Sequence, residues 1–195
     1  MTETDPYCWP GTDCLQNKLG ITDADQLSEV EFRLASIREV QASRMIIPGG
    51  YGLDHLQCFH RHLFSDIYPW AGQTRRVDIS KPGARFCHWR YIDDQVSTVL
   101  GRLSDDGFLL GLRPDAFVEA LAHYYGELNV CHPFREGNGR TIRSFLRQLA
   151  AAAGYLLDWS ELNPEANITA CQQHLATTDP SLLITVLGPV VRRLP

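Results

Sequence analysis

The segment His132–Arg143 reads HPFREGNGRTIR, and it joins two stretches whose apolar residues recur at helical spacing. Pro133 disfavours helical backbone at the residue before it, so the first helix ends there and leaves His132 at a helix end. Gly137 and Gly139 let the main chain turn tightly and come close to a ligand. The second helix begins at these glycines, and its unpaired N–H groups and dipole favour an anion. The segment therefore predicts an anion-binding turn between two helices.

The charged side chains of the same segment suit a polyphosphate. Arg140 and Arg143 are three residues apart, so they share one helical face and can bind phosphate oxygens in forked geometry. Glu136 is a lone carboxylate beside this site, which suits Mg²⁺, an ion that takes one or two protein ligands along with phosphates and water. His132 is suited to general-base work near neutral pH, because the reference pKa of a histidine side chain is about 6.5.

Other interpretations of these residues are disfavoured. Gly137-x-Gly139 lacks the third glycine of the dinucleotide fingerprint and follows a helix instead of a strand, and the chain has no P-loop consensus. Cys131 is a poor candidate for a thiol nucleophile, because adjacent side chains usually diverge and the preceding helix would bury it. His55 and the other two histidines of its helix are expected to be surface or core residues, not zinc ligands.

Helical periodicity covers most of the chain and predicts a mainly α fold. After the segment quoted above, Ile142, Phe145, Leu146, Leu149 and Ala150 form an apolar stripe that predicts a buried helix face. We expect helices at 22–44, 53–68, 91–103, 115–129, 140–153, 164–176 and 181–192. A single domain is predicted over 1–195, with an N-terminal arm at 1–20, an active-site loop at 132–143 and C-terminal helices at about 160–195.

Two further expectations concern the first helix and the strands. The apolar residues Leu27, Val30, Leu34, Ile37 and Val40 predict the buried face of the helix at 22–44. Apolar residues alternate with polar ones at 77–79 and resume at 86, with Lys-Pro-Gly at 81–83 between them. This pattern predicts a short β-hairpin at about 74–90 and is the only strand signal in the sequence.

Composition limits the classes of function. The chain has 195 residues, 44% of them hydrophobic, and a net charge of -5. No overall basic field draws it to nucleic acid or to an anionic membrane, and no uncharged stretch reaches the ~20 residues that span a bilayer. The first residues lack the pattern of a secretory signal, and the six cysteines are scattered, so we expect a cytoplasmic protein without disulfides.

The segment 132–143 resembles the signature of Fic proteins, His-x-Phe-x-Asp/Glu-Gly-Asn-Gly-Arg-x-x-Arg, and has all eight of its specified residues. Asp5-Pro6-Tyr7 near the start, the run from His62 to Arg75 that contains Trp70-Ala-Gly72, and Ile79-Ser-Lys81 up to Phe86 resemble the small bacterial Fic toxins. The resemblance implies a helical bundle with one hairpin flap. It also implies a protein adenylyltransferase, which moves AMP from ATP to a hydroxyl side chain of a target protein and releases pyrophosphate.

The resemblance also implies roles for individual residues. His132 would deprotonate the target hydroxyl, Phe134 would fix the loop in the core, and Glu136 would hold Mg²⁺ on the α- and β-phosphates. The nucleotide-binding residues would be Gly137, Asn138, Gly139, Arg140, Arg143 and Lys81. The flap, with Arg75, Lys81 and Phe86, would bind the modified segment of the target by strand-like pairing.

Control is expected to come from a second protein. Fic proteins are commonly restrained by a helix with Ser/Thr-x-x-x-Glu-Gly/Asn, whose Glu pairs with the second arginine of the motif. Residues 28–32 and 160–164 have no Glu at the required place. We therefore expect a small antitoxin whose Glu contacts Arg143, an isolated chain that is active and toxic, and targets such as DNA gyrase and topoisomerase IV.

Two other functions stay open on the sequence. One is transfer of another phosphate-containing group, phosphoryl or phosphocholine, although relatives of that kind usually alter the second glycine or the first arginine, and Gly139 and Arg140 are intact. The other is a non-catalytic binding module, which has no need of the base at His132. Labelling with ATP that carries the label on the α- or the γ-phosphate separates the three.

Overall fold

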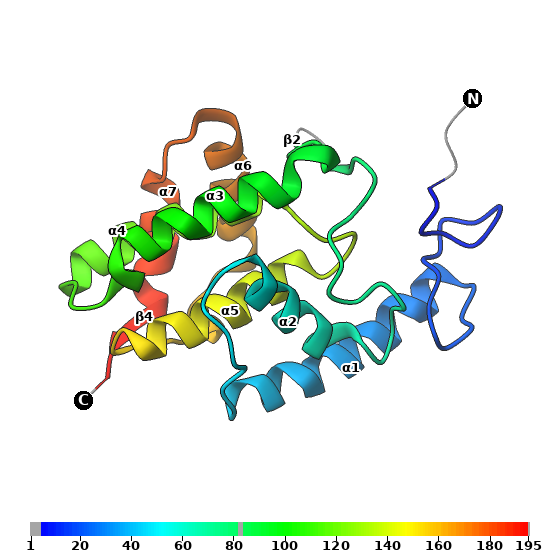
Figure 1. The fold of residues 1–195 in the computed structure, drawn as a ribbon, viewed down its shortest axis with the longest axis horizontal. Helices are drawn as coiled ribbons and strands as arrows, with labels where there is room; N and C mark the ends of the chain where they lie inside the picture. Colours follow the sequence, from blue (N-terminus) through cyan, green and yellow to red (C-terminus); the bar gives the residue numbers. More distant parts are fainter. Residues whose placement is uncertain (1–4, 82–83, 195) are drawn as a thin grey trace.

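A computed structural model describes residues 5–81 and 84–194 and confirms the mainly α fold. The helices are α1 (Ala24–Ser43), α2 (Leu53–Phe64), α3 (Ile92–Asp105), α4 (Pro114–Cys131), α5 (Asn138–Ala152), α6 (Pro164–Thr177) and α7 (Ser181–Leu187). Figure 1 shows α3 and α4 on one side of the molecule, with α5, α2 and α1 following in turn. No helix in these ranges is both long enough and apolar enough to cross a bilayer.

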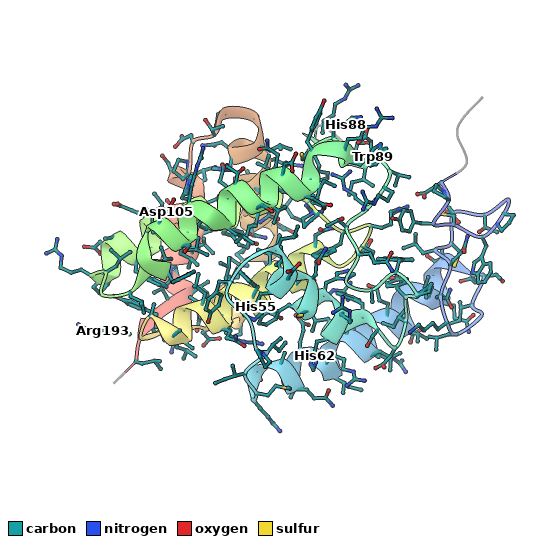
Figure 2. The ribbon with its side chains drawn as sticks, in the orientation of Figure 1. His55, His62, His88, Trp89, Asp105 and Arg193 are labelled. Atoms are coloured by element: carbon teal, nitrogen blue, oxygen red, sulfur yellow. The ribbon has the colours of Figure 1, made fainter. Side chains whose placement is uncertain are left out.

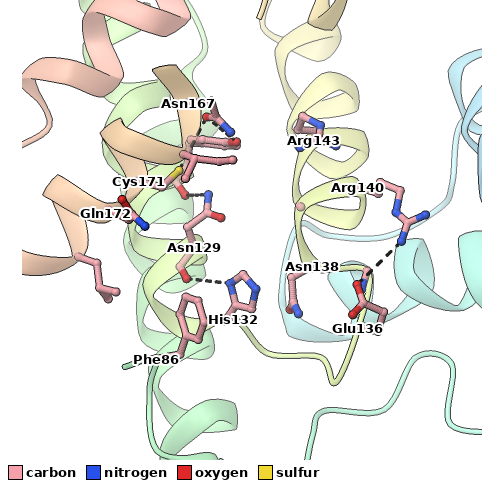
Figure 3. Close-up of a pocket in the computed structure, with 15 residues that line it drawn as sticks. Phe86, Asn129, His132, Glu136, Asn138, Arg140, Arg143, Asn167, Cys171 and Gln172 are labelled. Atoms are coloured by element: carbon pink, nitrogen blue, oxygen red, sulfur yellow. Dashed lines mark hydrogen bonds and ion pairs between the residues drawn. The ribbon is translucent and has the colours of Figure 1, made fainter. Parts of the chain in front are cut away.

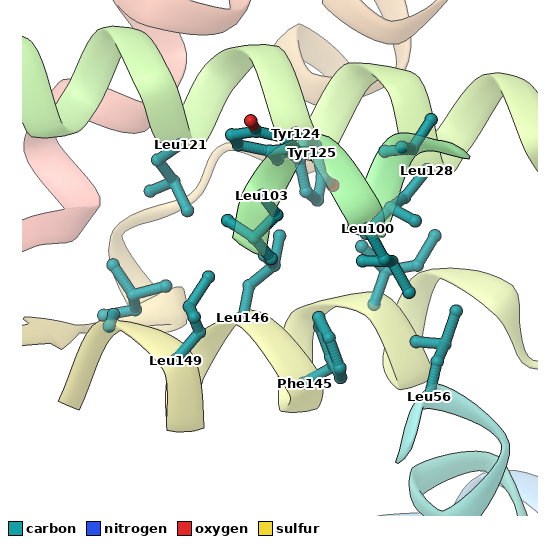
Figure 4. Close-up of a cluster of buried hydrophobic side chains, with 14 of the residues drawn as sticks. Leu56, Leu100, Leu103, Leu121, Tyr124, Tyr125, Leu128, Phe145, Leu146 and Leu149 are labelled. Carbon is teal, nitrogen blue, oxygen red and sulfur yellow. The ribbon is translucent and has the colours of Figure 1, made fainter. Parts of the chain in front are cut away.

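Helix α5 lies at the centre of the fold, in contact with α1, α2 and α4. Its predicted stripe is confirmed, because Ile142, Phe145, Leu146, Leu149 and Ala150 are all fully buried. These side chains pack against leucines of α3 and α4 and against Leu56 of α2 (Figure 4). Each fully buried Leu or Phe contributes roughly 2 kcal/mol of hydrophobic free energy. The stripe therefore fixes α5, and with it the preceding loop, against the core.

The buried face of α1 differs from the predicted one. The structure buries Leu27, Glu31, Ala35 and Ala42, whereas the expected core residue Ile37 is 57% exposed. Val40 is also exposed, and Val30 and Leu34 are only partly buried. Alanine lets α1 approach its neighbours α2 and α5 closely, and Glu31 is satisfied by polar partners. The small alanine side chains and the ion pair of Glu31 thus determine which face of α1 is buried, and the hydrophobic spacing does not.

The predicted hairpin is present but short. Strand β1 (Ser80–Lys81) pairs antiparallel with β2 (Ala84–Arg85), and residues 82–83 lie outside the described part of the chain. The main-chain N–H of Trp89 donates to the carboxylate of Asp78 at 2.8 Å and closes the base of the hairpin. Trp89 lies where the chain enters α3, at the opposite end of that helix from Asp105 (Figure 2).

A second small sheet was not predicted. Strand β3 (Tyr155–Leu157) pairs antiparallel with β4 (Val191–Arg193), where the sequence pattern predicted the end of a helix at 181–192. That helix ends at Leu187, because Pro189 lacks the N–H that a continuing helix needs. Three-residue strands are too short to produce a recognisable alternation.

The N-terminal arm packs on the helices. The ring of Tyr7 meets Trp70 edge-on, with centroids 5.4 Å apart. The indole N–H of Trp9 donates to the main-chain oxygen of Ile21 at 2.9 Å. Leu15 is buried beside Leu63 and other residues at the end of α2. Residues 5–20 are therefore an ordered part of the fold.

Candidate active site

The loop between α4 and α5 begins with an unusual backbone conformation. His132 caps α4 in the left-handed region, with φ 44° and ψ 61°, and its N–H donates to Leu128 at 3.1 Å. A non-glycine residue in this conformation needs support from its surroundings. Two residues later, Phe134 is fully buried and stacks on His60 with ring centroids 3.9 Å apart, so the expected fixing of the loop in the core is confirmed.

Asn138 and Gly137 determine the path of the loop into α5. The Asn138 amide accepts from the Phe134 N–H at 2.8 Å and donates to the Phe134 oxygen at 2.7 Å. Gly137 has φ 78°, and a Cβ there would lie 2.3 Å from the ring of Phe64. Only glycine fits this position without a shift of its neighbours. The side chain of Asn138 thus closes the loop, which sequence reasoning did not anticipate.

His60 of α2 holds the loop by a hydrogen bond to its main chain and by stacking on Phe134. Its Nδ1 accepts from the Gly72 N–H at 2.7 Å, so Nε2 carries the proton and donates to the Glu136 main-chain oxygen at 3.0 Å. The ring is fully buried, and burial lowers the pKa of His60 to about 3. The histidines of α2 were expected to be surface or core residues, and His60 and His55 are core residues; His55 bonds to the main-chain oxygen of Ile47.

A hydrogen bond and a ring contact help to orient the imidazole of His132. Nδ1 lies 3.1 Å from the main-chain oxygen of Asn129, which can only accept, so Nδ1 carries the proton. In the neutral ring Nε2 then has the lone pair that a general base needs. The ring stacks on Phe86 of the flap, with centroids 3.9 Å apart and planes 14° apart.

His132 and the two arginines of the motif line one pocket of about 310 Å³. Figure 3 shows His132, Phe86 and residues of α4 and α6 on one wall, and Arg140 and Arg143 of α5 on the other. The full lining is Phe86, Tyr125, Asn129, His132, Glu136, Gly137, Asn138, Gly139, Arg140, Arg143, Asn167, Ile168, Cys171, Gln172 and Leu175. The predicted residues of the loop are therefore brought together around one cavity.

Part of this lining comes from α6, which sequence reasoning left unassigned. Asn167, Cys171 and Gln172 of α6 lie on the same wall as Asn129 of α4, opposite Arg140 and Arg143 (Figure 3). Asn167 accepts from the hydroxyl of Tyr125 on α4 at 3.0 Å, which joins the two helices. The sequence had no signal for this wall, because α6 lies more than 20 residues beyond the motif and its polar residues look like those of any solvated helix.

Arg140 is held by a buried carboxylate of α1. Its guanidinium donates to Glu31, which also accepts from the hydroxyl of Tyr68. The same guanidinium lies over the ring of Phe64, 4.8 Å from the centroid, and 3.9 Å from the carboxylate of Glu136. Burial, together with the charge of Glu31, raises the pKa of Tyr68, so its hydroxyl stays a proton donor. The sequence held one signal for this ion pair: Glu31 is four residues from Leu27, so it lies on the same side of α1 as that buried residue.

Arg75 is not a surface residue of the flap, which corrects its expected contact with a target. Its side chain is buried, with 1% of the residue exposed. It donates to main-chain oxygens on both sides, to Val77 and Cys87 of the flap and to Cys131 and His132 where α4 meets the loop. Phe86, by contrast, is partly exposed and borders the pocket.

Of the other predicted residues, Glu136 borders the pocket. Glu136 has a side chain 46% exposed at the pocket, and its Oε1 accepts from the Gly137 N–H at 2.8 Å. The side chain of Lys81 lies outside what the structure describes. Cys131 is buried, and burial raises the pKa of its thiol to about 12, which agrees with its exclusion as a nucleophile.

Comparisons with known proteins agree with this geometry. A family model described as Fic/DOC family matches residues 51–150. The probable protein adenylyltransferase Fic of Salmonella typhimurium is 44% identical over 161 residues, 83% of this chain and 80% of that protein. Protein adenylyltransferase VbhT of Bartonella schoenbuchensis is 44% identical over 158 residues, 81% of this chain and 33% of that protein. The crystal structure of BepC from Bartonella tribocorum with bound AMPPNP matches at 26% identity with a TM-score of 0.91, over 97% of both chains.

The helical bundle and its loop define a transferase of the Fic fold. The chain belongs to the Fic/DOC family. It is an enzyme of the protein adenylyltransferase class, as the sequence resemblance predicted.

Proposed function

We propose that this chain transfers AMP from ATP to a hydroxyl side chain of another protein, in the cytoplasm, and releases pyrophosphate. One observation carries the proposal: His132 lies across a single pocket from Arg140 and Arg143. A base on one wall and two fixed cations on the other match a reaction in which a hydroxyl attacks one end of a polyphosphate. AMPPNP, an ATP analogue, is bound in BepC, which supports ATP as the donor.

The chemistry follows from the two walls. Nε2 of His132 would accept the proton of the target hydroxyl while the hydroxyl oxygen forms a bond to the α-phosphorus. The bond from that phosphorus to the oxygen bridging to the β-phosphate breaks, and pyrophosphate leaves with the electron pair. Arg140 at the β-phosphate and Arg143 at the γ-phosphate would offset the growing negative charge. The N–H groups at the start of α5, near Gly137 and Gly139, would bind phosphate oxygens.

The residues present fit Mg²⁺. Glu136 offers one partly exposed carboxylate at the pocket, and the described residues contain no cluster of three His, Cys, Asp or Glu that would hold a metal without the nucleotide. A single carboxylate with phosphate oxygens and water is the coordination that Mg²⁺ accepts. The ion, when bound, would neutralise phosphate charge.

Labelled ATP tests the proposal. The purified chain is incubated with a bacterial lysate and with ATP labelled on the α- or the γ-phosphate. We expect label in protein from the α position only. His132→Ala should abolish transfer while ATP affinity and thermal unfolding stay near those of the wild type. Label from the γ position would support phosphoryl transfer, and no label from either would support a binding module; both outcomes reject adenylyl transfer.

We further propose that a small antitoxin restrains the enzyme by placing a Glu on Arg143. A groove of about 530 Å³ lies beside the nucleotide pocket and shares Glu136, Arg140 and Arg143 with it. Phe32 of α1 borders this groove and is 67% exposed, which suits the apolar face of a helix. A helical peptide with Ser-x-x-x-Glu-Gly should inhibit transfer, and its Glu→Gln form should not. Equal inhibition by both peptides would reject the Glu–Arg pairing.

Type II topoisomerases are the proposed targets, on the resemblance to small Fic toxins. Purified DNA gyrase and topoisomerase IV, each with α-labelled ATP, should become labelled and lose supercoiling or decatenation activity. The target must supply a hydroxyl that reaches His132 beneath the flap. Absence of label in both enzymes, with label in other proteins of the lysate, would reject these targets and leave adenylyl transfer intact.

A further inference from the structure

Arg75 joins the flap to the catalytic loop through main-chain oxygens. Its Nη1 donates to Val77 at 2.7 Å and its Nη2 to Cys87 at 2.5 Å, which fixes both ends of the flap. Its Nε donates to His132 at 2.9 Å, and Nη2 also reaches Cys131 at 3.3 Å. One planar guanidinium thus binds four carbonyls that come from two separate segments.

The main chain of Arg75 adds a fifth bond. Its N–H donates to the oxygen of Pro133 at 2.8 Å, so this one residue binds the carbonyls of Cys131, His132 and Pro133. These three peptides flank the left-handed conformation of His132. Carbonyls at the end of a helix lack intrahelical partners, and Arg75 supplies donors for them. Arg75 therefore stabilises the left-handed backbone at His132 by hydrogen bonds to these three carbonyls.

The charge of Arg75 is satisfied in an unusual way. The nearest carboxylate is Asp78, 3.8 Å away and 56% exposed, so carbonyl dipoles supply most of the stabilisation. A buried cation of this kind is costly unless every donor is used. Lysine cannot replace it, because one ammonium has three donors around a point and cannot reach four carbonyls in a plane.

We propose that Arg75 is a positioning residue, which fixes the His132 imidazole beneath the flap so that Nε2 faces the pocket. The ring contacts two neighbours: Nδ1 bonds to the main-chain oxygen of Asn129, and the ring stacks on Phe86. Both contacts depend on where the peptide of His132 and the flap lie, and Arg75 sets both. This role rests on the proposed function, because it acts through the base.

The test compares Arg75→Lys and Arg75→Gln with the wild type. Arg75 does not line the nucleotide pocket, so ATP affinity should stay within twofold. We expect kcat for adenylyl transfer to fall about 100-fold, a loss that misplacing a reacting group by about 1 Å can cause. The ¹⁵N spectrum of the His132 ring, assigned by its loss in His132→Ala, should change from one tautomer to a mixture. Arg33→Lys, at an exposed arginine of α1, is the matched control and should keep its kcat.

The possible results are distinct. A folded Arg75 variant with wild-type kcat and one tautomer overturns the proposal, and so does a parallel loss of kcat and ATP affinity. Arg75→Gln provides the same readouts if Arg75→Lys unfolds. Wild-type transfer by His132→Ala would instead remove His132 from its role as the base, and only a lack of α-label in protein with the wild-type chain would reject the proposed function.

Discussion

Acidification should destabilise this protein through His60. The buried ring stays neutral in the folded state, with a pKa of about 3, whereas the unfolded chain protonates it near 6.5. Below pH 6.5 the unfolded state therefore binds more protons, and stability falls as pH falls until the folded pKa is reached. Each pH unit in this window costs about 1.4 kcal/mol. Between pH 7 and pH 5, His60 alone should lower the free energy of unfolding by about 2 kcal/mol.

Urea unfolding at pH 7 and pH 5 measures this effect. His60→Gln keeps an N–H that can reach the Glu136 oxygen but does not titrate, and it should be less stable than the wild type at pH 7 because the stacking on Phe134 is lost. The wild type should lose about 2 kcal/mol more than His60→Gln between the two pH values. His88→Gln, at an exposed histidine, controls for removal of an imidazole. Equal losses in the wild type and His60→Gln would show that His60 is not kept neutral by burial.

Three further predictions concern α1 and the loop. Glu31→Ala should raise the KM for ATP about fivefold, because Arg140 loses its partner. Ordering the freed arginine side chain on ATP binding then costs about 1 kcal/mol. An unchanged KM would contradict this reasoning. Gly137→Ala should lower the free energy of unfolding by about 3 kcal/mol, from the left-handed backbone and the contact with Phe64, and a loss below about 1 kcal/mol in urea unfolding would be inconsistent with the geometry. Ile37→Ser should change stability by less than about 0.5 kcal/mol, since the residue is exposed; a large loss by the same measurement would restore the face predicted from sequence.

The sequence predicted what local chemistry determines. The 3.6-residue spacing of apolar residues predicts the buried stripe of α5, and Pro133 with the two glycines predicts the turn before it. The loop residues that line the pocket could therefore be predicted from the sequence. The orientation of α1 was predicted wrongly because Glu31 is buried by its partners Arg140 and Tyr68, which no local pattern specifies. Tertiary ion pairing outweighed hydrophobic spacing there.

Long-range contacts explain the other differences. Arg75 looks like a flap residue because it precedes β1, and only the fold brings the carbonyl of His132, 57 residues away, to its guanidinium. The wall from α6 and the pairing of β3 with β4 also join segments far apart in the chain. Such contacts determine whether a polar side chain is exposed to solvent, binds a target or bonds to a buried carbonyl, and the local sequence does not specify them.

The ion pair between Asp5 and Arg135 has a practical consequence. Arg135 donates twice to one oxygen of Asp5, at 2.9 and 2.7 Å, so the arm and a variable position of the motif are directly bonded. A tag or a protease cut at the amino end could disturb the contact of Asp5 with Arg135, and with it the active-site loop. The opposite end of the chain, at β4, lies on the far side of the molecule (Figure 1). Purification handles for kinetic work therefore belong on the carboxyl end.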